Sequence, residues 1–294
     1  VPMEHLLEEA QNLADGGVKE LILVAQETTM YGTDLYGEKR LPQLLRELCK
    51  INGLRWIRIL YCYPEEITDE LIQVIKEEPK ICHYLDLPIQ HASDGILKRM
   101  GRRTSKEQLI ETIEKLRREI PDIALRTTLI TGFPGETQEQ HEELMDFVDQ
   151  MEFDRLGVFT YSPEEDTPAA SMPDQIPEEV KEDRQAELME LQQDIVFDQA
   201  EDRIGEELLV MIEGKVADEN AYVGRTYRDA PNVDGLIFVN TSEELMSGDF
   251  ARVKVTGSAD YDLIGEFYGQ TECHCCSGDH CQRIYHQRIP SGCF

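Results

Sequence analysis

The stretch "ALRTTLITGFPGETQEQ", residues 124–140, contains three elements in succession: a buried strand, a glycine turn and the start of a helix. Gly132 and Gly135 allow the tight turn, because glycine adopts backbone angles that other residues avoid. Turns of this kind often hold a phosphate, but this one has no lysine and ends in the acid Glu136. The stretch predicts an alternating α/β fold and leaves open what the turn holds.

The same strand–turn–helix unit recurs through the first part of the chain. Apolar runs typical of buried strands occupy residues 21–25, 56–64, 84–90, 124–130 and 153–162. Helical patterns separate these runs, and two helices begin with capping-box spacings, Thr104 with Glu107 and Thr137 with Gln140. Five alternations predict parallel strands joined by helices. They are too few for a closed eightfold barrel, so an open doubly wound sheet or a partial barrel remains.

In either architecture, ligands bind at the carboxyl ends of the strands. Polar residues gather at all five of these ends, namely at residues 26–27, 61–64, 90–93, 131–136 and 161–165. We therefore expect one functional site along this edge of the sheet.

The chain is strongly acidic. Its 294 residues include 29 Lys and Arg against 59 Asp and Glu, a formal net charge of −30. Such a charge repels nucleic acid and anionic membranes unless a local basic patch exists. No apolar stretch approaches the length of a membrane span, and the first residues form an acidic amphipathic pattern rather than a signal peptide. We expect a cytoplasmic protein without a membrane partner.

The pattern changes after Pro163. A proline-rich loop and a long polar helix from Glu178 to about Asp202 are followed by short segments of period two, which predict a small antiparallel barrel over residues 204–266. This barrel segment has five Lys and Arg against thirteen Asp and Glu, a net charge of −8. The expected domains are residues 1–203, the barrel at 204–266, and a tail at 267–294.

Five segments occur in the order found in a known family. They are "AQETTMYGTDL" (25–35), "WIRILYCYP" (56–64), "YLDLPIQHASDGILKRMGR" (84–102), "LRTTLITGFPGET" (125–137) and "YSPEEDTPAA" (161–170). In these segments the chain resembles the radical SAM methylthiotransferases, and its barrel resembles the TRAM domain of that family. "DLPIQHAS", "LRTT" and "GRTYRDAPNVDG" are most similar to the branch that modifies a small-subunit ribosomal protein, and less similar to the tRNA-modifying branch.

The resemblance implies a partial (β/α) radical SAM barrel that binds S-adenosylmethionine. Gln26 and Glu27 match the segment that grips the methionine moiety, Gln90 and Ser93 lie where the ribose is held, and Ile130 would face the adenine through its backbone. The glycine turn would let the chain pass close to the cofactor. The residues that the resemblance assigns to the cofactor are Gln26, Glu27, Gln90, Ser93, Ile130, Gly132, Gly135 and Glu136.

The implied reaction adds a methylthio group to the β-carbon of an aspartate, and it requires 4Fe–4S clusters held by cysteine thiolates. Members of the family carry a C-x-x-x-C-x-x-C motif for one cluster, and this motif does not occur in the sequence. We expect the chain to be a fragment that lacks the N-terminal domain and the cluster loop, holds no metal ligands or assigned catalytic residue, and is inactive by itself.

Two features concern the substrate. Arg126 lies on the strand that leads to the glycine turn, and its guanidinium can hold a carboxylate through two hydrogen bonds. It would grip the substrate aspartate or the methionine carboxylate, or else form a structural ion pair. The acidic barrel would dock a basic ribosomal protein of the small subunit, through acids that include Glu206, Glu213, Asp218, Glu219 and Asp234, or these acids serve solubility alone.

Other interpretations remain open. The tail contains a Cys- and His-rich run from Cys273 to His286, but its irregular spacing favours an unrelated extension over a zinc site. The chain could instead modify tRNA, act on a phosphorylated metabolite in an ordinary α/β barrel, or serve as a non-catalytic binding module. Binding of S-adenosylmethionine favours the radical enzyme, and tight binding of tRNA would favour the tRNA-modifying relatives.

Overall fold

The computed structural model describes residues 1–272 and consists of two compact units. The first unit comprises Val1–Asp202 together with a short segment, Tyr227–Asp234. The second comprises Arg203–Thr226 and, among the described residues, the chain from Gly235 to Glu272. The Cys- and His-rich run lies outside the described residues. Within residues 1–272, no helix combines the length and the hydropathy that crossing a membrane requires.

The first unit is built on a five-stranded parallel sheet whose strand order follows the chain, β1-β2-β3-β4-β5. The strands are β1 (Glu20–Leu23), β2 (Trp56–Ile59), β3 (Ile81–Asp86), β4 (Ala124–Thr131) and β5 (Arg155–Thr160). Because parallel crossovers are right-handed, a sequential order places the connecting helices on one face of the sheet. The fold is therefore the partial barrel and not the doubly wound sheet, and the expected strand–helix alternation is confirmed.

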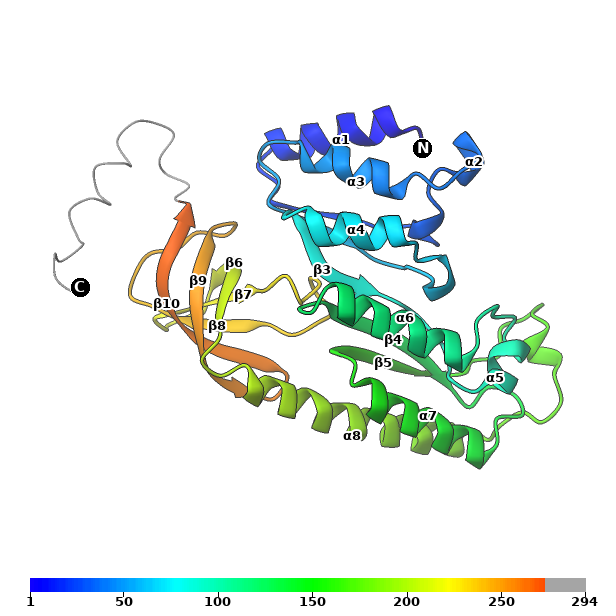
Figure 1. Cartoon of the computed structure of the whole chain (residues 1–294). Helices are drawn as coiled ribbons and strands as arrows, with labels where there is room; N and C mark the ends of the chain where they lie inside the picture. The colour runs from blue at the N-terminus through cyan, green and yellow to red at the C-terminus, as the bar shows by residue number, and fades with distance from the viewer. Residues whose placement is uncertain (273–294) are drawn as a thin grey trace. The chain divides into compact units, whose positions relative to one another are not determined.

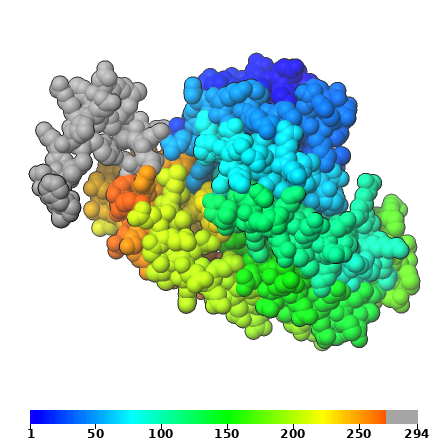
Figure 2. All heavy atoms as spheres, in the orientation of Figure 1, coloured from blue at the N-terminus to red at the C-terminus, as the bar shows by residue number. Residues whose placement is uncertain are grey.

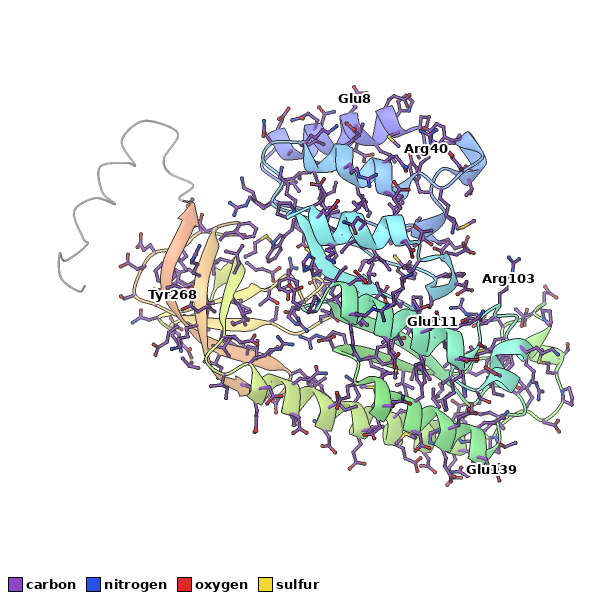
Figure 3. All side chains as sticks on the ribbon, viewed as in Figure 1. Glu8, Arg40, Arg103, Glu111, Glu139 and Tyr268 are labelled. Atoms are coloured by element: carbon purple, nitrogen blue, oxygen red, sulfur yellow. The ribbon has the colours of Figure 1, made fainter. Side chains whose placement is uncertain are left out.

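Helices α3, α4, α6 and α7 lie along the same side of this sheet (Figure 1), and their atoms cover it in the space-filling view (Figure 2). The helices of the unit are α1 (Met3–Asp15), α2 (Thr33–Tyr36), α3 (Leu41–Cys49), α4 (Asp69–Glu77), α5 (Asp94–Arg99), α6 (Lys106–Glu119), α7 (Gln138–Met151) and α8 (Glu178–Asp202). Short 3-10 turns occur at Thr28–Met30, Pro64–Glu66 and Ala169–Ser171. Charged residues such as Arg103 and Glu139 extend outward from the ribbon (Figure 3).

The two faces of β4 have different roles. Leu125 and Leu129 are fully buried in the core that the helices cover. Because side chains alternate along a strand, Arg126, Thr128 and Ile130 share the opposite, concave face. That face is where a partial barrel has room for a ligand.

The predicted capping boxes have different outcomes. Thr137 caps α7, and its partner Gln140 completes the capping box as expected. At α6 the cap is Ser105 with Gln108, so the predicted pair of Thr104 and Glu107 is wrong by one residue. Thr104 is buried just before the helix instead.

The second unit is a closed five-stranded barrel in the order β10-β8-β7-β6-β9. Its strands are β6 (Glu207–Lys215), β7 (Ala221–Arg225), β8 (Ile237–Asn240), β9 (Phe250–Ala259) and β10 (Asp262–Glu272). All pairs are antiparallel except β10 with β8, which is parallel and closes the barrel. Alternating apolar residues such as Val210, Ile212 and Val253 fill the interior.

The acids proposed to dock a partner do not share one environment. Glu206, Asp218 and Glu219 are exposed. Glu213 forms an ion pair with Arg225 at 2.5 Å. Asp234 belongs to the first unit and its side chain is completely buried, so its inclusion in a docking surface was wrong.

Arg58 on β2 is the largest fully buried side chain of the first unit. Its Nε donates to Glu20 at 2.7 Å and its Nη1 donates to the Tyr227 carbonyl at 2.7 Å, while its guanidinium lies over the Tyr84 ring. A buried charge is tolerated only when it is paired and hydrogen-bonded. Burial acts to lower the pKa of Arg58, but Cys82, Glu20 and Tyr84 more than offset that effect and the net pKa is raised.

Replacing Arg58 with alanine should lower the free energy of unfolding by about 3–5 kcal/mol, because Glu20 stays buried without this partner. Arg46→Ala is the matched control, since Arg46 pairs with Glu70 on the surface and such pairs contribute about 1 kcal/mol or less. Urea unfolding of the two variants measures the difference. Equal losses of stability would show that the Arg58 pair is not structurally important.

Candidate functional site

Two non-glycine residues at the ends of neighbouring strands adopt left-handed backbone angles. They are Tyr61, with φ of 58°, and Gln90, with φ of 73°. Such angles are costly and persist where surrounding contacts impose them. The Tyr61 amide donates to Asp86 Oδ2 at 3.2 Å; the Gln90 amide donates to Thr128 O at 2.9 Å, and its carbonyl accepts from the Ile130 amide at 2.8 Å. The carboxyl ends of β2, β3 and β4 are therefore tied into one fixed edge.

The glycine turn after β4 is closed by its own acid. Gly132 and Gly135 have φ of 72° and 77°, as the turn requires. Glu136 is buried, and its Oε2 accepts from the amides of Gly132 at 2.5 Å and Phe133 at 3.1 Å. These are the amides that would bind a phosphate in a nucleotide-binding loop. The turn already contains an anion, which explains the absence of a lysine.

Buried cationic and polar side chains surround Glu136. Arg184 Nη1 lies 3.3 Å from Oε1, and one ring nitrogen each of His91 and His141 lies 3.9 Å from the same atom. His91 Nδ1 accepts from the Ser93 amide at 2.9 Å, so its proton resides on Nε2 and faces Glu136. Burial acts to raise the pKa of Glu136, but His91, Arg184 and the turn amides outweigh it and the pKa is lowered.

A cavity of about 630 Å³ opens at the carboxyl ends of β3, β4 and β5. Its apolar wall includes Ile130, Phe133 and Phe159. Three polar atoms of its lining residues, Gln90 Oε1, Arg102 Nε and the Tyr161 hydroxyl, are buried without a hydrogen-bond partner in the described part of the chain. Buried polar atoms normally find partners. A ligand with an aromatic portion and several hydroxyl or amine groups would satisfy both features.

Sequence reasoning assigned only Gln90 and Ile130 of this cavity to the cofactor. Phe159 was missed, although it pairs in register with Ile130 and therefore shares its face. Arg102 was missed too: it lines the cavity, donates to the Pro88 carbonyl and lies over the Tyr63 ring at 4.5 Å. The alternation of β4 and β5 was the available signal for Phe159; no local pattern marks Arg102.

The remaining predicted cofactor residues lie in different places. Gln26 is exposed, and Glu27 borders a separate cavity of about 460 Å³. Glu27 Oε1 accepts from the Tyr63 amide at 3.3 Å, its Oε2 is buried without a partner among the described residues, and burial raises its pKa. Ser93 is buried at the N-cap position of α5 and does not line the 630 Å³ cavity. The Ile130 amide already donates to the Gln90 carbonyl and is not available to a ligand. Ile130 therefore contributes its side chain to the cavity wall.

Arg126 lies near the amino end of β4, away from the glycine turn. Its Nη1 donates to Asp234 Oδ1 at 2.5 Å, and its Nε lies 3.7 Å from Asp86 Oδ1. The structural ion pair considered for this residue is therefore present. Within residues 1–272, no group of three or more His, Cys, Asp or Glu side chains is arranged to hold a metal ion.

The lowered pKa of Glu136 predicts a pH-dependent contribution to stability. Because the folded pKa lies below the ordinary value of 4.5, the ionised carboxylate stabilises the fold above that pH, and this contribution is lost as the pH falls through the folded pKa. Glu136→Gln should cost about 1–3 kcal/mol at neutral pH, and its difference from the wild type should shrink near pH 3.5. Urea unfolding at both pH values measures this, with the exposed Glu142→Gln as control. A difference that is independent of pH would contradict the role of the charge.

Two family models match the chain. The model of the radical SAM superfamily matches residues 1–148, and the model of the TRAM domain matches residues 204–267. Among solved structures, methylornithine synthase (PylB) is 20% identical with a TM-score of 0.46, covering 65% of this chain and 54% of its own.

Curated relatives match nearly the whole described chain. Ribosomal protein uS12 methylthiotransferase RimO of Lachnoclostridium phytofermentans is 68% identical over 265 residues, which are 90% of this chain and 60% of the relative. The protein of the same name from Alkaliphilus oremlandii is 52% identical over 268 residues, 90% of this chain and 61% of the relative. The chain thus spans about three-fifths of the length of these relatives.

The resemblance identified from the ordered motifs is confirmed by these matches, as is the TRAM-like nature of the barrel. The parallel sheet with helices on one face and the closed barrel are the architecture that the resemblance implied. The chain belongs to the radical SAM superfamily.

Proposed function

We propose that this protein is a radical SAM methylthiotransferase that adds a methylthio group to the β-carbon of an aspartate in ribosomal protein uS12. The observation that carries the proposal is the 68% identity, over 90% of the chain, to a relative of that name. The order of the five motifs and the attached TRAM domain support the same assignment.

In this proposal the adenosine portion of S-adenosylmethionine occupies the 630 Å³ cavity. Ile130, Phe133 and Phe159 would contact the base, while Gln90 Oε1 and the Tyr161 hydroxyl would gain the partners that they lack. Together with a 4Fe–4S cluster, the bound cofactor supplies a radical that can remove hydrogen from an unactivated carbon.

The other assigned residues take part less directly. Gly132, Gly135 and Glu136 would act by holding the turn beneath the cofactor, since Glu136 faces its own backbone. Glu27, with its unpartnered Oε2, remains the candidate to receive the amino group of the methionine moiety, and Gln26 would lie beside it. The closed turn also argues against a phosphorylated metabolite as the substrate.

Arg126 is the candidate for holding the substrate carboxylate. It lies on the same face of β4 as Ile130, four residues toward the amino end, which is about 13 Å along a strand. Its ion pair with Asp234 uses Nη1. A guanidinium has five donors, so one carboxylate does not exhaust it.

The activity test uses the protein in its full length, purified without oxygen and with its iron–sulfur clusters reconstituted. Incubation with S-adenosylmethionine, a reductant and either uS12 or tRNA should add one methylthio group to an aspartate of uS12 only, as read by mass spectrometry of peptides and nucleosides. A reaction without S-adenosylmethionine is the control. Modified tRNA would assign the protein to the tRNA-modifying relatives, and no product with either substrate would favour a non-catalytic binding module.

The second proposal concerns the partner. The exposed acids Glu206, Asp218 and Glu219 of the barrel would attract a basic ribosomal protein, because complementary charge raises the association rate. Asp218→Asn combined with Glu219→Gln should slow association with uS12 and flatten its salt dependence, because exposed charges are largely screened beyond about 10 Å at 0.1 M salt. Surface plasmon resonance across a salt series measures both effects. The surface variant Glu8→Gln is the control, and an equal effect of that variant would show that only total charge matters.

A further inference from the structure

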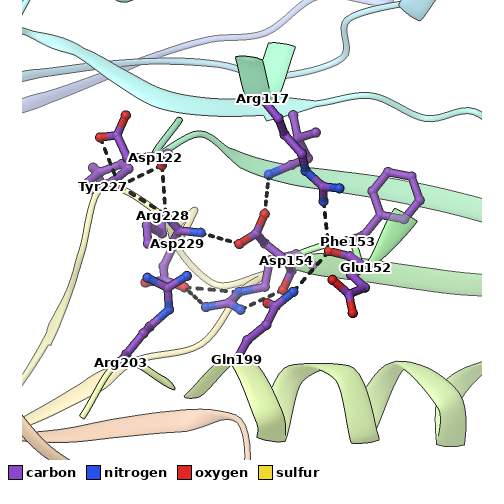
Figure 4. A network of polar contacts seen from close by, with 12 residues as sticks. Arg117, Asp122, Glu152, Phe153, Asp154, Gln199, Arg203, Tyr227, Arg228 and Asp229 are labelled. Carbon is purple, nitrogen blue, oxygen red and sulfur yellow. Dashed lines mark hydrogen bonds and ion pairs between the residues drawn. The ribbon is translucent and has the colours of Figure 1, made fainter. Parts of the chain in front are cut away.

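The segment Tyr227–Asp234 belongs to the radical SAM unit, although it lies between strands β7 and β8 in the sequence. Its first residues are anchored at the end of the sheet. The Tyr227 hydroxyl and Arg228 Nη1 both donate to the Asp122 carbonyl at 2.8 Å, and Arg228 also pairs with Asp154 (Figure 4). The Tyr227 carbonyl accepts from Arg58.

The middle of the segment is held by a second arginine of the sheet. Arg155 on β5 donates to Asp229 through Nε, at 3.2 Å, and through Nη2, while its Nη1 donates to the Asp154 carbonyl at 2.7 Å. All three donor groups of Arg155 are therefore used within the protein. This pair anchors the segment, and each nitrogen of the Arg155 guanidinium makes at least one hydrogen bond within the protein.

The last residue of the segment, Asp234, is an anion in a built site. Its Oδ2 accepts from the Tyr84 hydroxyl at 2.7 Å and from the Ala230 amide at 2.8 Å, and its Oδ1 accepts from Arg126 Nη1 at 2.5 Å. The side chain is completely buried. Burial and then the charge of Asp234 raise the pKa of Tyr84 well above its ordinary value, so the phenol stays protonated and remains a donor. The carboxylate of Asp234 is thereby fixed in place.

Arg126 differs from Arg155 in one respect. Its Nη1 is bound to Asp234 and its Nε faces Asp86, but its Nη2 has no hydrogen bond within residues 1–272. Gly157 lies beside this atom. A Cβ built on Gly157 would lie 3.7 Å from Nη2, so a side chain at this position would contact Nη2, whereas glycine leaves the space beside it open. Thus, within the described chain, one nitrogen of a positioned guanidinium makes no hydrogen bond, and the residue beside it, Gly157, has no side chain.

Asp86 is the other acid that faces Arg126. Burial raises the pKa of the Asp86 carboxyl, and the hydrogen bond from the Tyr61 amide and the charge of Arg126 offset this only in part. Its Oδ1 has no hydrogen-bond partner in the described chain. Because Asp86 Oδ1 lies 3.7 Å from Arg126 Nε and no hydrogen bond joins them, Asp86 does not occupy the Nη2 edge of the guanidinium, where a further carboxylate can bind.

We propose that Asp234 is a positioning residue that fixes Nη1 of Arg126 so that Nη2 is presented to the carboxylate of the substrate aspartate. This inference rests on the proposed function and extends it by naming Asp234 as the residue that orients the Arg126 guanidinium. A guanidinium can bind two carboxylates along different edges, whereas lysine cannot reproduce that geometry. Holding the group in its binding orientation before the substrate arrives reduces the entropy lost on binding.

The test compares Asp234→Asn, Arg126→Lys and Asp229→Asn in the full-length protein with reconstituted clusters. Titration calorimetry measures the binding of uS12 and of a uS12 variant whose target aspartate is asparagine, and turnover of uS12 is measured in parallel. The wild type should prefer the aspartate form by about tenfold or more, the value expected for a hydrogen bond between charged groups. Arg126→Lys and Asp234→Asn should lose most of this preference. Asp229→Asn should lower stability, since it removes an anchor of the same segment, but keep the preference.

Tyr84→Phe is the milder variant, which removes one hydrogen bond to Asp234 without changing any charge. It should reduce the preference in the same direction by a smaller factor, and it keeps the test valid if Asp234→Asn fails to fold. The inference would be overturned if Asp234→Asn and Tyr84→Phe both kept the full preference for the aspartate form of uS12. It would also be overturned if Asp229→Asn lost this preference to the same extent as Asp234→Asn. Wild-type protein that does not modify uS12 would contradict the proposed function, whereas wild-type protein that binds the aspartate and asparagine forms equally would contradict the positioning role.

Discussion

The concave face of the sheet carries charges that must be paired, and the rest of the first unit depends on that pairing. Arg126 and Arg155 lie directly opposite each other on β4 and β5, and like charges in such positions repel. Arg58 on β2 adds a third guanidinium, which is fully buried, whereas Arg126 and Arg155 are half-buried. Acids of the sheet alone do not pair with all three. Asp229 and Asp234 lie between the arginines, so the segment Tyr227–Asp234 is part of the sheet's electrostatic balance.

The same face changes character toward the carboxyl ends of the strands. Along β4 the concave residues run from Arg126 through Thr128 to Ile130, that is, from ionic to apolar. In the ionic half, Arg126 and Arg155 pair with Asp234 and Asp229. The apolar half opens into a cavity where Gln90, Arg102 and Tyr161 each have a buried polar atom without a partner among the described residues. The ionic and the apolar side chains thus follow one another along a single strand, with Arg126 in the ionic region and Ile130 at the cavity.

The sequence predicted those features that depend on local periodicity. Buried strands, the order of the helices and the cap at Thr137 follow from hydrophobic spacing and from side chains three residues apart. The cap of α6 was misplaced because Thr104 and Ser105 are adjacent and equally suitable residues. The pairs that hold Asp234 could not be predicted, since Arg126 is 108 residues distant and many other acids compete for it. The sequence analysis assigned Glu136 to the cofactor because its motif is recognisable. The side chain points into the protein instead, where it pairs with the buried Arg184 of α8, and a local motif does not reveal that contact.

The inward direction of Glu136 limits what the turn can contribute to recognition. A free glycine turn binds anions through its amides, but here the amides of Gly132 and Phe133 already bind a carboxylate. A ligand that depended on those amides would have to displace Glu136 from Arg184, and the cost of leaving a buried charge unpaired is several kcal/mol. The turn therefore contributes shape and apolar contact. Polar recognition beside it therefore comes from side chains with hydrogen bonds still unmade. Among the described residues that line the cavity, Gln90, Arg102 and Tyr161 each have a buried polar atom without a partner.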